Sequence, residues 1–169
     1  YMEAYLDIVK YILEKGEHKS NRTGTDTIAV AGMMFQHDMA DGFPLLTTKQ
    51  MARKTMLVEL ESFINGVTDK GWYQERGCHI WDEWCNPQVV PYGHDEETKR
   101  RMFEERDLGR IYGAQWRDFG GEDQLRNLIS TLATDPNSRR MIVSAWNPPE
   151  LKQMALEPCH WGYQATVIG

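Results

Sequence analysis

The sequence predicts an α+β fold in which helices pack on a mixed β-sheet. Apolar residues recur at helical spacing in three segments, and shorter runs rich in β-branched and apolar residues are typical of strands. The expected helices are 2–14, 47–65 and 123–134, and the expected strand segments are 28–39, 141–147 and 161–168. No internal repeat, low-complexity tract or linker divides the sequence. We therefore expect residues 1–169 to form a single domain.

Composition and charge restrict the class of protein. A chain of 169 residues with 41% hydrophobic and 26% charged residues can bury a core and has ordinary globular composition. The net charge of -6 predicts no nucleic-acid binding. Three cysteines without regular spacing indicate a reducing compartment, and no Cys/His spacing indicates a metal site. No apolar run is long enough to span a membrane, so we expect a cytoplasmic protein.

The first quarter of the chain combines a helix, 2–14, with a polar loop. The loop, 21–27, contains a glycine, short hydroxyl side chains and Arg22. Such a loop can present backbone N–H groups and a guanidinium to an anion, and the alternative is an ordinary turn. The segment after it, 28–39, is expected to form two paired strands.

The second helix carries the first candidate catalytic group. Thr47 or Thr48 is expected to be its N-cap and Asn65 its last residue. Its expected apolar face consists of Met56, Leu57, Leu60, Phe63 and Ile64. Glu59 adjoins this face, where a carboxylate is costly unless it is paired or hydrated. It is either an edge residue with its carboxylate in solvent or a cleft residue that transfers protons.

The middle of the sequence supplies large aromatic side chains. A short helical segment, 71–77, precedes Trp81 and Trp84, whose spacing of three places both indoles on one side of a helical turn. They suit either core packing or stacking against a flat heterocycle. Residues 86–107 are interpreted as a polar surface insertion with a short charged helix at 96–105.

The remaining candidates are a tyrosine, two arginines and a cysteine. Tyr112 lies in an expected glycine-bounded loop, 109–117, as a hydroxyl donor or a buried tyrosine. The helix 123–134 is expected to bury Leu125, Leu128, Ile129 and Leu132, and a short proline-started helix spans 148–156. Arg139 and Arg140 precede a strand, where they either bind anions or remain solvated. Cys159 stands where helix gives way to strand and is either a nucleophile or a buried thiol.

In this order, the segments resemble the thymidylate synthase family over essentially the whole chain. The matching segments before the 86–107 insertion are Asn21-Arg22-Thr23-Gly24-Thr25, Asp41-Gly42-Phe43-Pro44-Leu45 with Thr47-Thr48-Lys49, and Ile80-Trp81-Asp82-Glu83-Trp84. Those after it are Tyr112-Gly113, Gln115-Trp116-Arg117, Asp135-Pro136 with Ser138-Arg139-Arg140, Ser144-Ala145-Trp146-Asn147 and Pro158-Cys159-His160. Each segment alone is a weak signal, whereas the ordered set is highly specific.

The resemblance implies the reductive methylation of dUMP to dTMP with 5,10-methylenetetrahydrofolate. In such an enzyme Cys159 would be the nucleophile that adds to carbon 6 of the uracil ring. Glu59 would organise water and relay protons, and Tyr112 would support proton removal from carbon 5. His160 would support the surroundings of the nucleophile.

The resemblance also implies binding contacts and a homodimer. Arg22 would hold the dUMP phosphate, and Arg139 and Arg140 would reach the same phosphate in the partner's site. The folate-binding residues would be Lys49, Ile80, Trp81 and Trp84, with the aromatic side chains against the pterin ring and the lysine near the folate tail.

The sequence departs from the family pattern at several positions and leaves two alternatives open. The departures are Ala52 for histidine, Ser62 for a helix aromatic, Arg110 for proline and Glu157 for a small residue. Because the family's chain continues past the nucleophile strand, we expect an N-terminal portion of a longer enzyme. The alternatives are a dUMP or dCMP hydroxymethylase of the same fold, and a non-catalytic remnant or binding protein. Trp81 favours the synthase, and the presence of Cys159 argues against a remnant.

Overall fold

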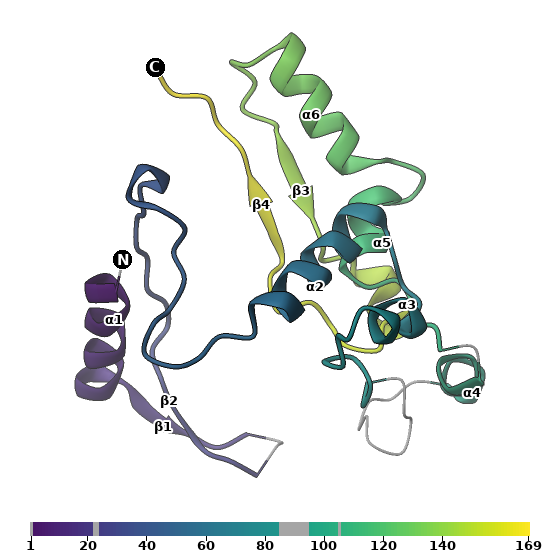
Figure 1. Cartoon of the computed structure of the whole chain (residues 1–169), viewed down its shortest axis with the longest axis horizontal. Coiled ribbons are helices and arrows are strands. Elements are labelled where there is room, and N and C mark those ends of the chain that lie inside the picture. The colour runs from purple at the N-terminus through teal and green to yellow at the C-terminus, as the bar shows by residue number, and fades with distance from the viewer. Residues whose placement is uncertain (1, 22–23, 85–94, 105) are drawn as a thin grey trace. The chain divides into compact units, whose positions relative to one another are not determined.

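The computed structural model consists of two compact units, residues 1–51 and 52–169 (Figure 1). The residues that the structure describes are 2–21, 24–84, 95–104 and 106–169. Helices and short antiparallel sheets confirm the α+β class, while the expected single domain stays a prediction. The described strands form two separate antiparallel pairs, so the expected mixed sheet is not seen in this part of the chain. Within the described residues, no helix is long and apolar enough to cross a membrane.

The first unit contains one long helix and one strand pair. Helix α1 (Met2–Lys15) is followed by β1 (Glu17–Lys19), which pairs with β2 (Thr27–Ala29). The prediction of two strands within 28–39 is therefore wrong beyond Ala29, because β2 pairs with the segment after α1 and not with its own continuation. A single helical turn, η1 (Met39–Asp41), follows.

The second unit is organised around α2 (Arg53–Asn65), which ends at Gly66 with a left-handed φ of 69°. The predicted end is confirmed, but the predicted start at the threonines is wrong. Ala52 precedes the helix without a side-chain cap, and Thr47 donates its backbone N–H to Met2 Sδ within the first unit.

The buried face of α2 also differs from the predicted one. Val58, Ser62 and Phe63 are buried, and Leu57, Leu60 and Ile64 are exposed. Two contacts accompany this face: Ser62 shares a hydrogen bond with Tyr73, and α5 (Tyr112–Arg117) approaches so closely that a Cβ on Gly113 would lie 3.0 Å from the Ser62 carbonyl oxygen. The side of α2 that faces this glycine is therefore closely packed.

The shorter helices agree with the sequence in most cases. Helix α3 (Lys70–Glu75), α6 (Gln124–Thr134) and the 3-10 helix η2 (Pro148–Gln153) lie where helices are expected. Helix α4 (Glu96–Glu104) confirms the short charged helix, whereas 86–94 and 105 lie outside the described residues. The segment 109–117 is not a loop, because α5 begins at Tyr112. In α6 Leu128 is buried but Ile129 is exposed.

Strands β3 (Ile142–Ser144) and β4 (Gly162–Gln164) lie side by side and are shorter than predicted (Figure 1). Val143 pairs with Tyr163. Gln124 ties α6 to β3, since its side-chain amide donates to the Ser144 carbonyl at 2.8 Å and accepts the Ser144 N–H at 3.0 Å. The core beneath these elements includes Tyr73, Leu108, Ile111, Met141, Val143 and Met154.

Candidate active site

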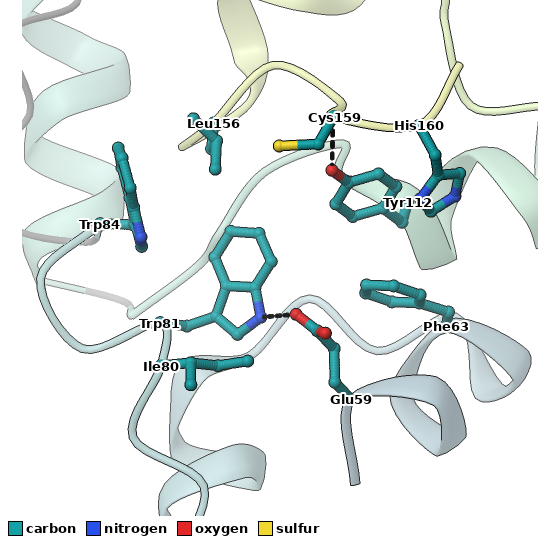
Figure 2. Close-up of a pocket in the computed structure, with 9 residues that line it drawn as sticks. All are labelled: Glu59, Phe63, Ile80, Trp81, Trp84, Tyr112, Leu156, Cys159 and His160. Carbon is teal, nitrogen blue, oxygen red and sulfur yellow. Dashed lines mark hydrogen bonds between the residues drawn. The ribbon is translucent and has the colours of Figure 1, made fainter. Parts of the chain in front are cut away.

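A cavity of about 290 Å³ lies in the second unit (Figure 2). Its walls come from α2, the turn after α3, α5 and the segment that follows η2. The residues that line it are Glu59, Phe63, Ile80, Trp81, Trp84, Tyr112, Leu156, Cys159 and His160. Every predicted catalytic residue and all three predicted pterin-wall residues are therefore brought together, although their roles stay predictions.

Glu59 enters the cavity from the half-buried side of α2. The Trp81 indole Nε1–H donates a hydrogen bond to Glu59 Oε1 at 3.1 Å (Figure 2). Burial raises the pKa of Glu59, and the Trp81 hydrogen bond opposes this by stabilising the carboxylate. A carboxyl group with a raised pKa and a fixed hydrogen-bond partner is suited to relaying protons.

Tyr112 and Cys159 meet on the other side of the cavity. The Cys159 backbone N–H donates to the Tyr112 hydroxyl oxygen at 2.5 Å (Figure 2). Burial raises the pKa of Tyr112 to about 12, the Cys159 N–H acts in the opposite direction, and negative charge at Cys159 and Glu59 raises it further. The phenol therefore keeps its proton at neutral pH and can use it in a hydrogen bond to the Cys159 sulfur or to a substrate.

The segment that carries Cys159 is attached to the segment that leads into Tyr112. Ala155 N–H donates to the Leu108 carbonyl at 2.8 Å, and Gly109 forms an isolated antiparallel bridge with Met154. These backbone contacts hold the nucleophile's segment beside α5. Cys159 itself is exposed and unbridged, so its thiol is accessible from the cavity.

His160 is held by aromatic rings. Its imidazole stacks on Tyr112 with centroids 4.4 Å apart and an interplanar angle of 19°. Phe63 and Trp116 flank it at 6.2 Å and 5.9 Å. Burial lowers the pKa of His160, so the ring is neutral at pH 7. His160 thus fixes the orientation of the Tyr112 ring without adding charge beside the thiol.

The opposite wall offers a flat surface to a ligand. Trp81, Trp84 and Ile80 come from one turn, in which the Trp84 N–H donates to the Trp81 carbonyl at 3.2 Å. Such a wall suits a planar ring. Among the described residues, no group of three or more His, Cys, Asp or Glu side chains could hold a metal ion.

The two arginines predicted to bind phosphate after α6 are not among the described residues that line this cavity. Arg139 and Arg140 are exposed between α6 and β3, and neither forms an ion pair with a residue that the structure describes. Lys49 is exposed in a bend of the first unit, and Arg22 lies outside the described residues. Their contacts stay predictions.

Sequence reasoning missed the polar network that supports α5. Gln115 is fully buried, donates to the Glu150 carboxylate at 2.7 Å and to the Arg110 carbonyl at 2.9 Å, and accepts from Asn147 at 3.1 Å. Arg110 Nε also donates to Glu150 at 3.0 Å. The Gln115-Trp116-Arg117 motif was the available signal, since a glutamine beside an apolar helical turn needs buried partners.

A thiol, a phenol and a carboxyl group around an aromatic-walled cavity are the components of a site for covalent nucleophilic catalysis. The family model described as thymidylate synthase matches residues 3–169. The chain is also similar to a thymidylate synthase of Mycoplasma genitalium, at 41% identity over 178 residues that cover 98% of this chain. The chain therefore belongs to the thymidylate synthase family. It spans 62% of the length of that curated relative.

Proposed function

We propose that the protein converts dUMP to dTMP by reductive methylation with 5,10-methylenetetrahydrofolate. Membership of the thymidylate synthase family supports the reaction. The single structural observation that carries it is the Cys159 backbone N–H bound to the Tyr112 hydroxyl at the cavity that Glu59 also lines. We further propose that β3 and β4 belong to the mixed sheet of this family in the whole protein.

Cys159 is the proposed nucleophile. Its thiolate adds to carbon 6 of the uracil ring, and the displaced electron pair moves through carbon 5 onto the carbon 4 oxygen as an enolate. Carbon 5 thereby becomes nucleophilic, which divides one difficult substitution into easier steps. At the end of the reaction carbon 6 expels the thiolate, so Cys159 is regenerated.

Tyr112 and Glu59 are the proposed proton carriers. The proton on carbon 5 leaves through water that the Tyr112 hydroxyl holds next to Cys159, as the 2.5 Å contact with the Cys159 N–H supports. Glu59 organises water on the other side of the base, and its raised pKa supports proton transfer to the uracil oxygen.

The folate fits the aromatic wall. When bound, 5,10-methylenetetrahydrofolate supplies the one-carbon unit and the hydride. Trp81, Trp84 and Ile80 provide the flat apolar surface that a pterin ring needs, and their side chains would shield the bound ring from water. Lys49 is proposed to bind the acidic folate tail.

The phosphate of dUMP is proposed to lie between arginines of two protomers. Arg22 contributes from the same chain, while Arg139 and Arg140 contribute to the site of the partner in a homodimer. The exposure of both side chains after α6 supports their availability. A planar guanidinium fork binds phosphate oxygens in a bidentate manner.

A mixed-dimer experiment tests this shared site. A Cys159→Ser protein and an Arg139→Ala/Arg140→Ala protein are each unable to turn over efficiently. After subunit exchange, hybrid dimers contain one native site, so about a quarter of wild-type activity is expected to return. If the arginines acted within their own protomer, every site would keep one defect and no activity would return.

Product analysis tests the reaction itself. The protein is incubated with dUMP and 5,10-methylenetetrahydrofolate, and the nucleotide and folate products are separated by liquid chromatography. We expect dTMP and dihydrofolate in equal amounts, and neither product with Cys159→Ser. A hydroxymethylated nucleotide with tetrahydrofolate would instead identify the hydroxymethylase.

A second experiment detects the covalent step. The analogue 5-fluoro-dUMP replaces the carbon 5 proton with fluorine, which cannot leave as a cation, so the adduct on the enzyme should persist with folate bound. Mass spectrometry of the Cys159 peptide should show the added nucleotide. Absence of any adduct on Cys159 would favour a non-catalytic binding protein.

A further inference from the structure

A serine and a tyrosine form a buried polar pair directly behind Glu59. Ser62 lies on α2 one turn after Glu59, and Tyr73 reaches it from α3. Both side chains are 0% exposed. Their oxygen atoms are 2.6 Å apart. Polar groups so deeply buried are costly unless every donor has an acceptor, so the direction of each bond matters.

The proton of each hydroxyl can be assigned by counting donors. Ser62 Oγ donates to the Glu59 backbone carbonyl at 2.6 Å, which uses its single proton. The Tyr73 hydroxyl must therefore be the donor in the bond between Tyr73 and Ser62. The result is a directed chain from Tyr73 through Ser62 to the helical turn that carries Glu59.

The other end of Tyr73 is attached to the segment that carries Trp81. The Tyr73 carbonyl accepts the Cys78 backbone N–H at 2.9 Å, three residues before Trp81. The Tyr73 ring also packs beside the Trp81 ring, with centroids 6.3 Å apart. Tyr73 thus contacts both the turn that presents Glu59 and the segment that presents its hydrogen-bond donor.

We propose that Ser62 and Tyr73 are positioning residues that hold the Glu59 carboxylate against the Trp81 indole. Trp81 and Glu59 belong to different segments, and their 3.1 Å hydrogen bond depends on the rotation of α2 relative to the turn at 80–84. A buried polar pair whose hydrogen bonds are all formed restricts this rotation more strictly than apolar packing does, because another rotation would break those bonds. The catalytic consequence rests on the proposed function of Glu59, whereas the geometric claim does not.

The test compares Tyr73→Phe, Ser62→Ala and the double variant with a control, Tyr163→Phe. The control also removes one phenolic hydroxyl, but from β4, where the Tyr163 ring packs on Trp116. The double variant leaves neither hydroxyl behind, so it does not strand a buried donor. Urea unfolding of each protein confirms that it is folded before the site is examined.

The principal measurement is the nitrogen-15 NMR signal of the Trp81 indole N–H. In Tyr73→Phe and Ser62→Ala we expect the signal of this proton to shift upfield and the proton to exchange with water about two- to tenfold faster. This factor corresponds to the net free energy of one hydrogen bond. Tyr163→Phe should leave both properties unchanged. If the variants lose stability while the Trp81 signal and its exchange rate stay at wild-type values, the pair is merely structural and the proposal is overturned.

Kinetics give a second, separable result. If Glu59 acts as proposed, kcat for dTMP formation should fall about two- to tenfold in Tyr73→Phe, with little change in KM for dUMP. An unchanged kcat beside an altered indole signal would refute the kinetic part of the proposal. A wild-type protein that forms no dTMP would refute the proposed function, while the indole measurement would still decide the positioning.

Discussion

Gly109 is the position at which an added methyl group should move the segment that carries Cys159 away from Tyr112. Its φ is +76°, and a Cβ added there would lie 1.7 Å from the Gln153 carbonyl oxygen and 2.9 Å from its carbon. A left-handed conformation costs a residue with a side chain about 1–2 kcal/mol. Forcing backbone apart in a packed region costs about 1–3 kcal/mol more. Gly109→Ala should therefore destabilise the protein by about 2–5 kcal/mol.

Gly120 provides a matched control for this substitution. Its φ is also positive, at +61°, but nothing lies within 4 Å of the position a Cβ would take. Gly120→Ala should cost only the conformational part, about 1–2 kcal/mol. Urea unfolding at constant pH, followed by tryptophan fluorescence, measures both free energies.

The two variants should differ in their free energy of unfolding. Gly109→Ala must be more destabilised than Gly120→Ala, because only the first also displaces the backbone of η2. It should also lose activity in its folded fraction, since the displaced segment carries Cys159 away from Tyr112. Equal losses of stability in the two variants would refute the steric reasoning.

Two further predictions concern the groups around α5. Tyr112→Phe removes the hydroxyl that accepts the Cys159 N–H and should lower kcat by about 10²-fold or more. Initial-rate measurements should show a smaller effect on KM for dUMP. A loss of kcat below about threefold would contradict the proposed role of Tyr112 in proton removal. The hydrogen bond from Gln115 holds the pKa of Glu150 below its ordinary 4.5, and Arg110 acts in the same direction while burial opposes both. The Glu150 carboxylate therefore stabilises the fold above pH 4.5. This stabilisation is lost as the pH falls through the lower pKa of the folded state. Glu150→Gln should therefore cost about 1–3 kcal/mol at pH 7 and progressively less as the pH falls below 4.5, as urea unfolding along a pH series would show; a cost that does not change with pH would contradict it.

The composition of the candidate site could be predicted because its chemistry is local in sequence. Cys159 and His160 are neighbours, and Trp81 and Trp84 share one turn, so each motif remains intact whatever the tertiary arrangement. The order of such motifs identified the family. What sequence could not supply was the pairing between motifs, such as the Trp81 hydrogen bond to Glu59.

The orientation of α2 could not be predicted from its apolar pattern. Leu57, Leu60 and Ile64 form a regular stripe, and hydrophobic periodicity alone favours burying it. The structure instead buries Ser62, because its hydroxyl satisfies and is satisfied by a tyrosine from another helix. Hydrophobic periodicity considers only the apolar residues, so it cannot predict the burial of Ser62, whose hydrogen-bond partner Tyr73 lies eleven residues away in sequence.

The lengths of the strands were overestimated for a related reason. A β-branched run such as 141–147 indicates which residues favour an extended backbone, but a strand ends where its pairing with the neighbouring strand ends. Strand β3 ends at Ser144, after which the Ala145 and Trp146 N–H groups both donate to the Trp161 carbonyl and the ladder stops.

The distribution of charge around the cavity supports the proposed site shared between protomers. None of the nine described residues that line the cavity is a lysine or an arginine. Arg110 and Arg117, which flank Tyr112 in sequence, are held by carboxylates, including Glu150 and Asp123. The described residues of this wall therefore include no cation for the phosphate of the proposed dUMP substrate. Exposed arginines on a second copy of the chain, together with Arg22, would supply that charge, and the mixed-dimer experiment measures directly whether Arg139 and Arg140 do so.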